Sequence, residues 1–148
     1  MLPFRFVYIQ WEDAVASNEE GVFFLSNLER HVFVCTNHRE PGSARPSCTT
    51  DGKGELHALL KQKADAAGLK HRVRINKAGC LGQCEHGPSV VVYPEQVWYG
   101  FVQPGDVDEI VQEHLVGGRP VERLVLPQEC IHTASCPHRP APVLPQKK

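Results

Sequence analysis

Residues 71–102 read HRVRINKAGC LGQCEHGPSV VVYPEQVWYG FV and hold most of the information about the fold. The first six residues alternate polar and apolar side chains, as in a half-buried strand. The glycine-rich loop that follows holds Cys80 and Cys84. Two β-rich runs, 89–93 and 97–102, come next and are joined by a three-residue turn that begins with proline. The stretch therefore predicts a strand, a loop with two thiols and a β-hairpin.

The flanking sequence adds one strand and two helices. Residues 31–35 form a short apolar run typical of a buried strand, and residues 55–69 carry leucine and alanine at helical spacing. Residues 106–115 predict a second helix, with Asp106 at its N-cap and Glu109 three residues later. A helix between the first two strands predicts a crossover and a parallel pair. We expect an α/β, thioredoxin-like arrangement, a mixed four-stranded sheet with two main helices.

The composition divides the chain into a domain and two flanking segments. We expect the domain over residues 29–125 and an N-terminal extension, with a short strand near its start, over residues 1–28. Residues 119–148 hold six of the twelve prolines, which predicts an extended tail over residues 126–148. The N-terminus has no continuous apolar region and no small-residue cleavage site, and no apolar run has the length of a membrane span. We therefore expect a cytoplasmic protein.

Charge and cysteine content narrow the function. The 148 residues include 16 Lys+Arg and 17 Asp+Glu, a formal net charge of -1, which excludes a strongly basic nucleic-acid-binding protein. Six cysteines in a chain without an export signal indicate metal binding or redox chemistry more than a disulfide framework.

Four of these cysteines follow the spacing C-x12-C-x31-C-x3-C and are Cys35, Cys48, Cys80 and Cys84. Each pair lies at or just after the end of a predicted strand, where surface sites are usually built. Four thiolates match the requirement of a [2Fe–2S] cluster, two for each iron. The short spacing between Cys80 and Cys84 allows both to reach one iron.

Two other readings of the four cysteines are weaker. A structural zinc site, in an interaction module without a redox role, usually has two short C-x2-4-C pairs, and one pair here is twelve residues apart. Passive or redox-labile thiols are the second alternative. The C-x-x-C motif of thioredoxin-type dithiol exchange is absent.

The tail contains a second cluster of potential ligands. Cys130, His132, Cys136 and His138 form the pattern C-x-H-x3-C-x-H. Its spacing is not a standard zinc framework and prolines surround it, so we interpret these residues as passive, with a metal site or a small disulfide as the alternative.

Other side chains near the predicted site have ordinary structural interpretations. We read the charges that flank the cluster loops as solvated loop residues, with steering of an acidic electron-transfer partner or damping of the cluster charge as the alternatives. These charges are Arg39, Arg45, Lys53 and Lys77. Trp98 and Tyr99 are expected in the core or at a subunit interface, and His114 on a helix face.

Two segments resemble a known family. The first is Cys35-Thr36-Asn37-His38-Arg39 with Ser47-Cys48, and the second runs from Ala78 through Cys80, Cys84 and Pro88 to the Val97-Trp98-Tyr99-Gly100 strand. Over about residues 31–125 they resemble the thioredoxin-like [2Fe–2S] ferredoxins, including the Shethna type. They are also similar to the cluster domain of the flavin-side subunit of respiratory complex I.

The resemblance implies a one-electron carrier and not an enzyme. It implies one [2Fe–2S] cluster per chain with Cys35, Cys48, Cys80 and Cys84 as its ligands, and a homodimer that exchanges electrons with a reductase or another oxidoreductase. It also allows a redox-sensing or protective protein that binds an enzyme conditionally.

Overall fold

The computed structural model describes residues 27–49, 54–133 and 136–138. The strand that the sequence predicts near the N-terminus lies outside these residues, as does Lys53. No helix among the described residues is long and apolar enough to cross a membrane.

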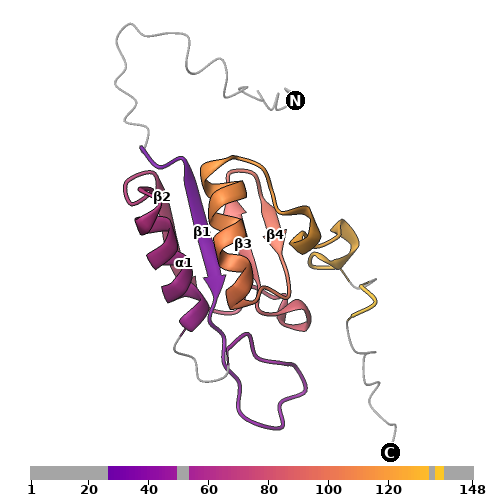
Figure 1. Cartoon of the computed structure of the whole chain (residues 1–148). Coiled ribbons are helices and arrows are strands. Elements are labelled where there is room, and N and C mark those ends of the chain that lie inside the picture. The colour runs from indigo at the N-terminus through magenta and orange to yellow at the C-terminus, as the bar shows by residue number, and fades with distance from the viewer. Residues whose placement is uncertain (1–26, 50–53, 134–135, 139–148) are drawn as a thin grey trace, which may run out of the picture.

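A four-stranded sheet in the order β2-β1-β3-β4 forms the framework (Figure 1). The strands are β1 (Arg30–Cys35), β2 (Val73–Ala78), β3 (Val90–Tyr93) and β4 (Val97–Tyr99). β1 pairs with β2 in parallel and with β3 in antiparallel orientation, and β3 and β4 form the hairpin. The predicted parallel pair and hairpin are both confirmed.

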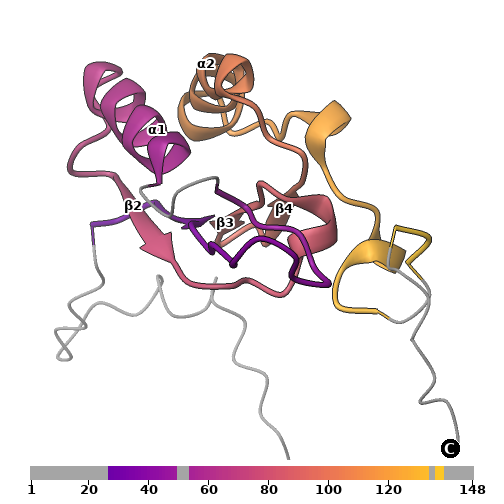
Figure 2. The ribbon, with the colours of Figure 1, turned by 90° about the horizontal axis from the view of Figure 1, so that it is seen from below.

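Two helices cover the same face of this sheet (Figure 2). The first is α1 (Glu55–Ala66). The second consists of a 3-10 turn, η2 (Pro104–Asp106), one α-helical turn, α2 (Val107–Glu109), and a π-helical segment, η3 (Ile110–Val116). The α/β, thioredoxin-like class expected from the sequence is confirmed.

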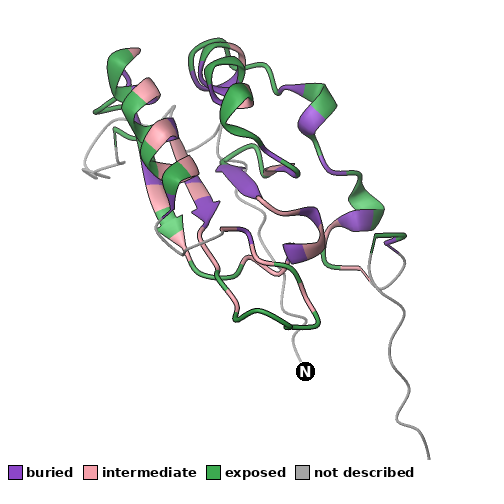
Figure 3. Cartoon of the chain, turned by 60° about the horizontal axis from the view of Figure 1, so that its bottom comes forward, coloured by how far each residue is buried: buried purple, intermediate pink, exposed green. Residues whose placement is uncertain are grey.

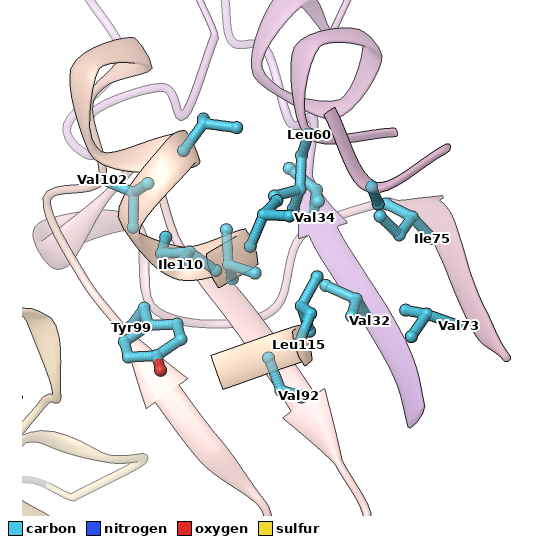
Figure 4. Close-up of a cluster of buried hydrophobic side chains, with 14 of the residues drawn as sticks. Val32, Val34, Leu60, Val73, Ile75, Val92, Tyr99, Val102, Ile110 and Leu115 are labelled. Carbon is cyan, nitrogen blue, oxygen red and sulfur yellow. The ribbon is translucent and has the colours of Figure 1, made fainter. Parts of the chain in front are cut away.

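The hydrophobic core lies between this sheet face and the two helices (Figure 4). Val32 and Val34 of β1 and Leu60 of α1 are each at most 1% exposed, and Ile110 and Leu115 of the second helix are fully buried. Each such side chain contributes about 1.5–3 kcal/mol through burial. The helices keep their outer faces exposed, whereas β3 is buried except at Tyr93 (Figure 3). The core thus holds the two helices firmly on the sheet from whose ends the site loops project.

Several boundaries differ from the prediction. The strand predicted over residues 71–76 lies two residues later, as β2. Three other boundaries differ for clear local reasons. Helix α1 ends at Ala66 and not Leu69, because Gly68 adopts φ +79 and closes the turn. The second helix begins earlier, with the 3-10 turn η2. Asp106 is the N-cap of α2 as predicted, but its side chain makes no cap hydrogen bond there and accepts from the Gln103 backbone N–H (2.8 Å). Strand β4 ends at Tyr99, because Phe101 has φ +53 and its N–H donates to the His86 carbonyl (2.7 Å).

The first part of the predicted tail packs against the domain. The Leu126 N–H donates to the Trp98 carbonyl (2.8 Å), and the Gly100 N–H donates to the Leu124 carbonyl (3.0 Å). Leu126 is buried, and a side chain on Gly100 would collide with it at 2.4 Å. Two short turns, η4 (Glu122–Leu124) and η5 (Gln128–Cys130), lead the chain onward. The described residues beyond position 126 are therefore not a free extended chain.

Candidate metal centre

The ends of the two parallel strands bring the predicted ligands together. Parallel strands end at the same edge of a sheet, and Cys35, the last residue of β1, is in register with Ala78, the last residue of β2. The Thr36 N–H and hydroxyl both donate to the Ala78 carbonyl, at 3.0 and 2.9 Å. The loops after β1 and β2 therefore leave the sheet side by side (Figure 1).

Cys35 and Cys48 form the first pair of thiols. The loop after β1 folds back so that the Cys48 N–H donates to the Asn37 carbonyl (3.0 Å). Both residues are buried, 1% and 5% exposed. A hydrogen bond from the Cys48 thiol lowers the pKa of Cys35 to about 5, although burial acts in the opposite direction. The same contact, with burial, raises the pKa of Cys48.

Cys80 and Cys84 form the second pair, with their sulfurs 3.2 Å apart. Gly82 adopts φ +76 between them, and its N–H donates to the Cys80 sulfur (3.3 Å). Cys84 opens the turn η1 (Cys84–His86) and is 1% exposed, whereas Cys80 is exposed. One thiol of the centre thus reaches the molecular surface.

The two thiols of the second pair differ in acidity. Burial opposes ionisation of Cys80, but the Gly82 N–H and the Cys84 thiol outweigh it, so the pKa of Cys80 is lowered. Burial raises the pKa of Cys84, and a nearby arginine offsets this only in part. In each pair the pKa of one thiol is therefore lowered and that of the other is raised.

Arg39 is that arginine, and its position corrects the sequence interpretation of it as a solvated loop charge. Its Nη1 donates to the Cys84 sulfur (3.0 Å) and to the Pro46 carbonyl (2.7 Å). Its Nη2 lies 3.6 Å from the Cys80 sulfur. These thiols raise the pKa of Arg39 further, so the guanidinium stays charged beside them.

Arg45 is also paired and not simply solvated. Its guanidinium makes two hydrogen bonds to the Glu85 carboxylate, at 2.7 and 2.8 Å. Glu85 follows Cys84 in η1, so this ion pair ties the loop after β1 to the loop after β2.

Gly87 leaves the space beside the Cys48 sulfur open, because a side chain at position 87 would come within 2.7 Å of that sulfur.

Three tail residues and one residue of η1 form a second cluster of potential ligands. The donor atoms of His86, Cys130, Cys136 and His138 all lie within 4.8 Å of one another. Sequence reasoning missed His86, since it lies 50 residues before Cys136. His132 does not join them. Its ring packs edge-on against Trp98, with ring centroids 5.2 Å apart, and lies beside Gly82.

His114 lies on the second helix, as expected, and its side chain is buried. Its Nδ1 accepts a hydrogen bond from the Tyr99 hydroxyl (2.7 Å), which in turn accepts from the Val121 N–H (3.0 Å). Tyr99 is fully buried, which confirms the core placement expected for it.

Comparison with known proteins shows clear relatives, although no family model matches the chain. The chain is 48% identical over 98 residues to the protein "Ferredoxin, 2Fe-2S" of Aquifex aeolicus (strain VF5). The aligned residues make up 66% of this chain and 88% of the relative. A protein of the same name from Clostridium pasteurianum is 42% identical over 98 residues, 66% of this chain and 96% of the relative.

The chain belongs to the [2Fe–2S] ferredoxin family. The family predicted from the sequence is thereby confirmed, and its members are electron-transfer proteins and not enzymes.

A solved structure supports the same assignment at the level of the fold. The wild-type thioredoxin-like [2Fe–2S] ferredoxin from Aquifex aeolicus superposes with a TM-score of 0.63 at 47% identity, over 67% of this chain and 97% of that chain. Two further structures of that ferredoxin carry Cys-to-Ser substitutions at cysteines four positions apart, the spacing of Cys80 and Cys84 here.

Proposed function

We propose that this ferredoxin carries single electrons on one [2Fe–2S] cluster held by Cys35, Cys48, Cys80 and Cys84. The observation that carries the proposal is the meeting of these four thiols as two pairs at one edge of the sheet. Cys35 and Cys48 would bind one iron, and Cys80 and Cys84 the other. The cluster, when bound, supplies a one-electron change between its oxidised and reduced states.

The residues around the four thiols suit a bound [2Fe–2S] cluster. The Gly82 N–H and the Arg39 guanidinium donate to the sulfurs, and hydrogen bonds and positive charge at sulfur stabilise a negatively charged cluster. Gly87 keeps the space beside the Cys48 sulfur free of a side chain. The pKa values of Cys48 and Cys84 are raised by burial and by their neighbouring thiols, and cluster assembly would release a proton from each thiol that carries one.

The same pairing argues against zinc at these cysteines. In a tetrahedral Zn²⁺ site all four sulfurs surround one ion, with sulfurs roughly 3.8 Å apart. Among the described residues, the group whose donors all lie within 4.8 Å of one another contains neither Cys35 nor Cys80. Two separated pairs suit two metal ions, as in a binuclear cluster.

The exposure of Cys80 and the free thiols of the site support the proposed partner and location. Cys80 is exposed at the edge of the domain, which allows a reductase or another oxidoreductase to approach the cluster closely. We place the protein in the cytoplasm, because its four site cysteines are free thiols and such sets persist in reducing compartments.

We also propose a homodimer, formed through the sheet face opposite the helices. Among described residues, no helix covers that face (Figure 2). It presents Phe33 and Tyr93, whose rings meet edge-on with centroids 6.2 Å apart, and Trp98, which pairs with Val91. An aromatic patch of this kind suits burial against a second copy of the chain.

Iron and acid-labile sulfide analysis of anaerobically purified protein tests the cluster assignment. We expect two irons and two sulfides per chain, visible absorption that bleaches with dithionite, and an EPR signal in the reduced state. Cys84→Ala should lose this signal and Cys136→Ala should keep it, because alanine offers no ligand atom to iron. Loss of the iron–sulfur centre in Cys136→Ala but not in Cys84→Ala would move the cluster to the tail group. Zinc without sulfide in the wild type would refute the proposal.

A further inference from the structure

A second group of metal-binding side chains lies apart from the four cysteines. The His86 Nε2 is 3.0 Å from the Cys136 sulfur, and the His138 Nδ1 is 3.6 Å from both the Cys136 and the Cys130 sulfurs. The donor atoms all lie within 4.8 Å of one another. His86 comes from turn η1, while the other three residues come from the tail.

We propose that His86, Cys130, Cys136 and His138 bind one structural Zn²⁺ ion. Two thiolates and two imidazoles are a ligand set of structural zinc, with Zn–S about 2.3 Å and Zn–N about 2.0–2.1 Å. A tetrahedron with these bond lengths has donor–donor edges of roughly 3.3–3.8 Å. The three observed separations, 3.0, 3.6 and 3.6 Å, are already close to those edges.

The surroundings of the group favour a closed site. His86 is 0% exposed, and Cys130 and Cys136 are 2% and 4% exposed. The Phe101 ring meets the His86 and His138 rings edge-on, with centroids 5.8 and 5.7 Å apart. His138, the fourth residue, is exposed. Four protein donors would fill a tetrahedral coordination sphere and leave no open position for a substrate, which distinguishes a structural from a catalytic zinc site.

Gln83 orients the buried imidazole from the other side. Its amide is buried and lies 3.1 Å from the His86 Nδ1. In the orientation that satisfies all of its hydrogen-bonding atoms, the Gln83 amide nitrogen donates to the Cys130 carbonyl (2.9 Å) and to the His86 Nδ1 (3.1 Å), and Oε1 accepts from the His132 N–H (2.8 Å). A neutral imidazole that accepts at Nδ1 carries its proton on Nε2. Zinc binding at Nε2 would therefore move the imidazole proton to Nδ1 and turn the amide so that Oε1 accepts a hydrogen bond from it, the usual arrangement around a zinc-bound histidine.

The proposed zinc would connect the tail to the loop of the other site. Cys84 and His86 belong to the same three-residue turn, so an ion on His86 restrains the turn that presents Cys84. The zinc proposal rests on the tail residues and stands whether or not the four cysteines hold a cluster.

Zinc K-edge EXAFS and metal analysis of the purified full chain test the proposal. We expect one zinc per chain, in addition to any iron, with two sulfur and two nitrogen neighbours. Cys136→Ser and His138→Gln should each lower the zinc content at least fivefold and leave the iron content unchanged. His132→Gln is the matched control, because it has the same side-chain chemistry in the same segment but lies outside the group, and it should keep the zinc.

Three other results would each overturn the zinc proposal, and they can be told apart by experiment. Four sulfur neighbours, together with loss of zinc in Cys48→Ser, would place the ion at the other cysteines and overturn the proposal. A disulfide between Cys130 and Cys136 in freshly purified protein, detected by peptide mass mapping, would overturn it as well. Absence of zinc from wild-type protein produced in zinc-supplemented medium would also overturn the proposal. This measurement uses only the wild-type protein, so it does not depend on whether a variant folds.

Discussion

Arg39 is the residue through which the loop after β1 reaches the thiols of the loop after β2. Its guanidinium lies 3.0 Å from the Cys84 sulfur and 3.6 Å from the Cys80 sulfur. A positive charge at that distance stabilises the reduced, more negative form of a bound cluster more than the oxidised form. Arg39 is therefore expected to tune the reduction potential more than the fold.

Arg39→Gln should shift the reduction potential to a more negative value, on the order of tens of millivolts. A redox titration followed by EPR measures this shift. Arg72→Gln is the control, because Arg72 pairs with Glu29 (2.6 Å) just before the opposite end of β2. Equal shifts in the two variants would show that only the net charge matters and not the contact of Arg39 with the sulfurs.

Gly87 acts on the same site through its lack of a side chain. In Gly87→Ala the new Cβ would lie 2.7 Å from the Cys48 sulfur and 3.2 Å from the Cys84 carbonyl, so one of these groups must move. We expect a cost of about 1–3 kcal/mol in the free energy of unfolding and a lower iron content per chain.

Gly79→Ala serves as the control for Gly87→Ala. Gly79 lies in the same loop, but a Cβ there meets nothing within 4 Å. Urea unfolding and iron analysis of both variants give the comparison. A Gly87→Ala protein that kept its iron and stability would mean that Cys48 can shift without loss of the site.

Among the elements, β4 and the second helix meet at a buried polar pair, Tyr99 and His114. The Tyr99 hydroxyl bridges the His114 Nδ1 and the Val121 N–H, at 2.7 and 3.0 Å. Burial lowers the pKa of His114, although Glu95, 3.8 Å from its Nε2, acts in the opposite direction. His114 therefore stays neutral in the folded protein at pH values where the unfolded chain takes up a proton.

This difference predicts acid destabilisation. Below a pH of about 6.5, the ordinary pKa of histidine, the unfolded state binds a proton that the folded state lacks, so the free energy of unfolding falls as the pH falls. The slope from one such group reaches at most about 1.4 kcal/mol per pH unit. His114→Gln should flatten the slope between pH 7 and pH 5 in urea unfolding.

Part of the pH dependence of the free energy of unfolding should remain in His114→Gln. Burial also lowers the pKa of His57, which lies on α1 and therefore adds a contribution of the same sign. His71→Gln is the control for replacing a histidine at an exposed position. An unchanged slope in His114→Gln would show that His114 is protonated in the folded state.

At the scale of the whole molecule, the asymmetry of the sheet predicts association. One face carries both helices, and no described helix covers the other (Figure 2). The uncovered face presents Phe33, Tyr93 and Trp98. Light scattering after size-exclusion chromatography should give about twice the chain mass of 16.5 kDa. Tyr93→Glu should shift the protein toward the single-chain mass, because it buries a charge in the proposed interface.

Lys61→Glu is the matched control for the dimer, since it changes charge on the exposed surface of α1, on the other side of the sheet. It should leave the mass of two chains unchanged. A wild-type protein with the mass of one chain at micromolar concentration would refute the dimer proposal.

The sequence by itself determined the order of the elements, the parallel pair, the hairpin and the family. These follow from local signals, namely side-chain periodicity, turn residues and the spacing of cysteines, which act within one element or one loop. The proposed ligands Cys80 and Cys84 share one such loop, and their sulfurs do meet at 3.2 Å.

Only the tertiary structure decided which distant side chains meet. Arg39 reaches a sulfur 45 residues away, and His86 joins a cysteine 50 residues away. The pattern C-x-H-x3-C-x-H suggested His132 as a partner of the tail cysteines, but packing against Trp98 turns its ring away. The physical reason is that spacing along a chain limits only near neighbours, whereas the bonds between the tail and β4 carry Cys130 and Cys136 to η1.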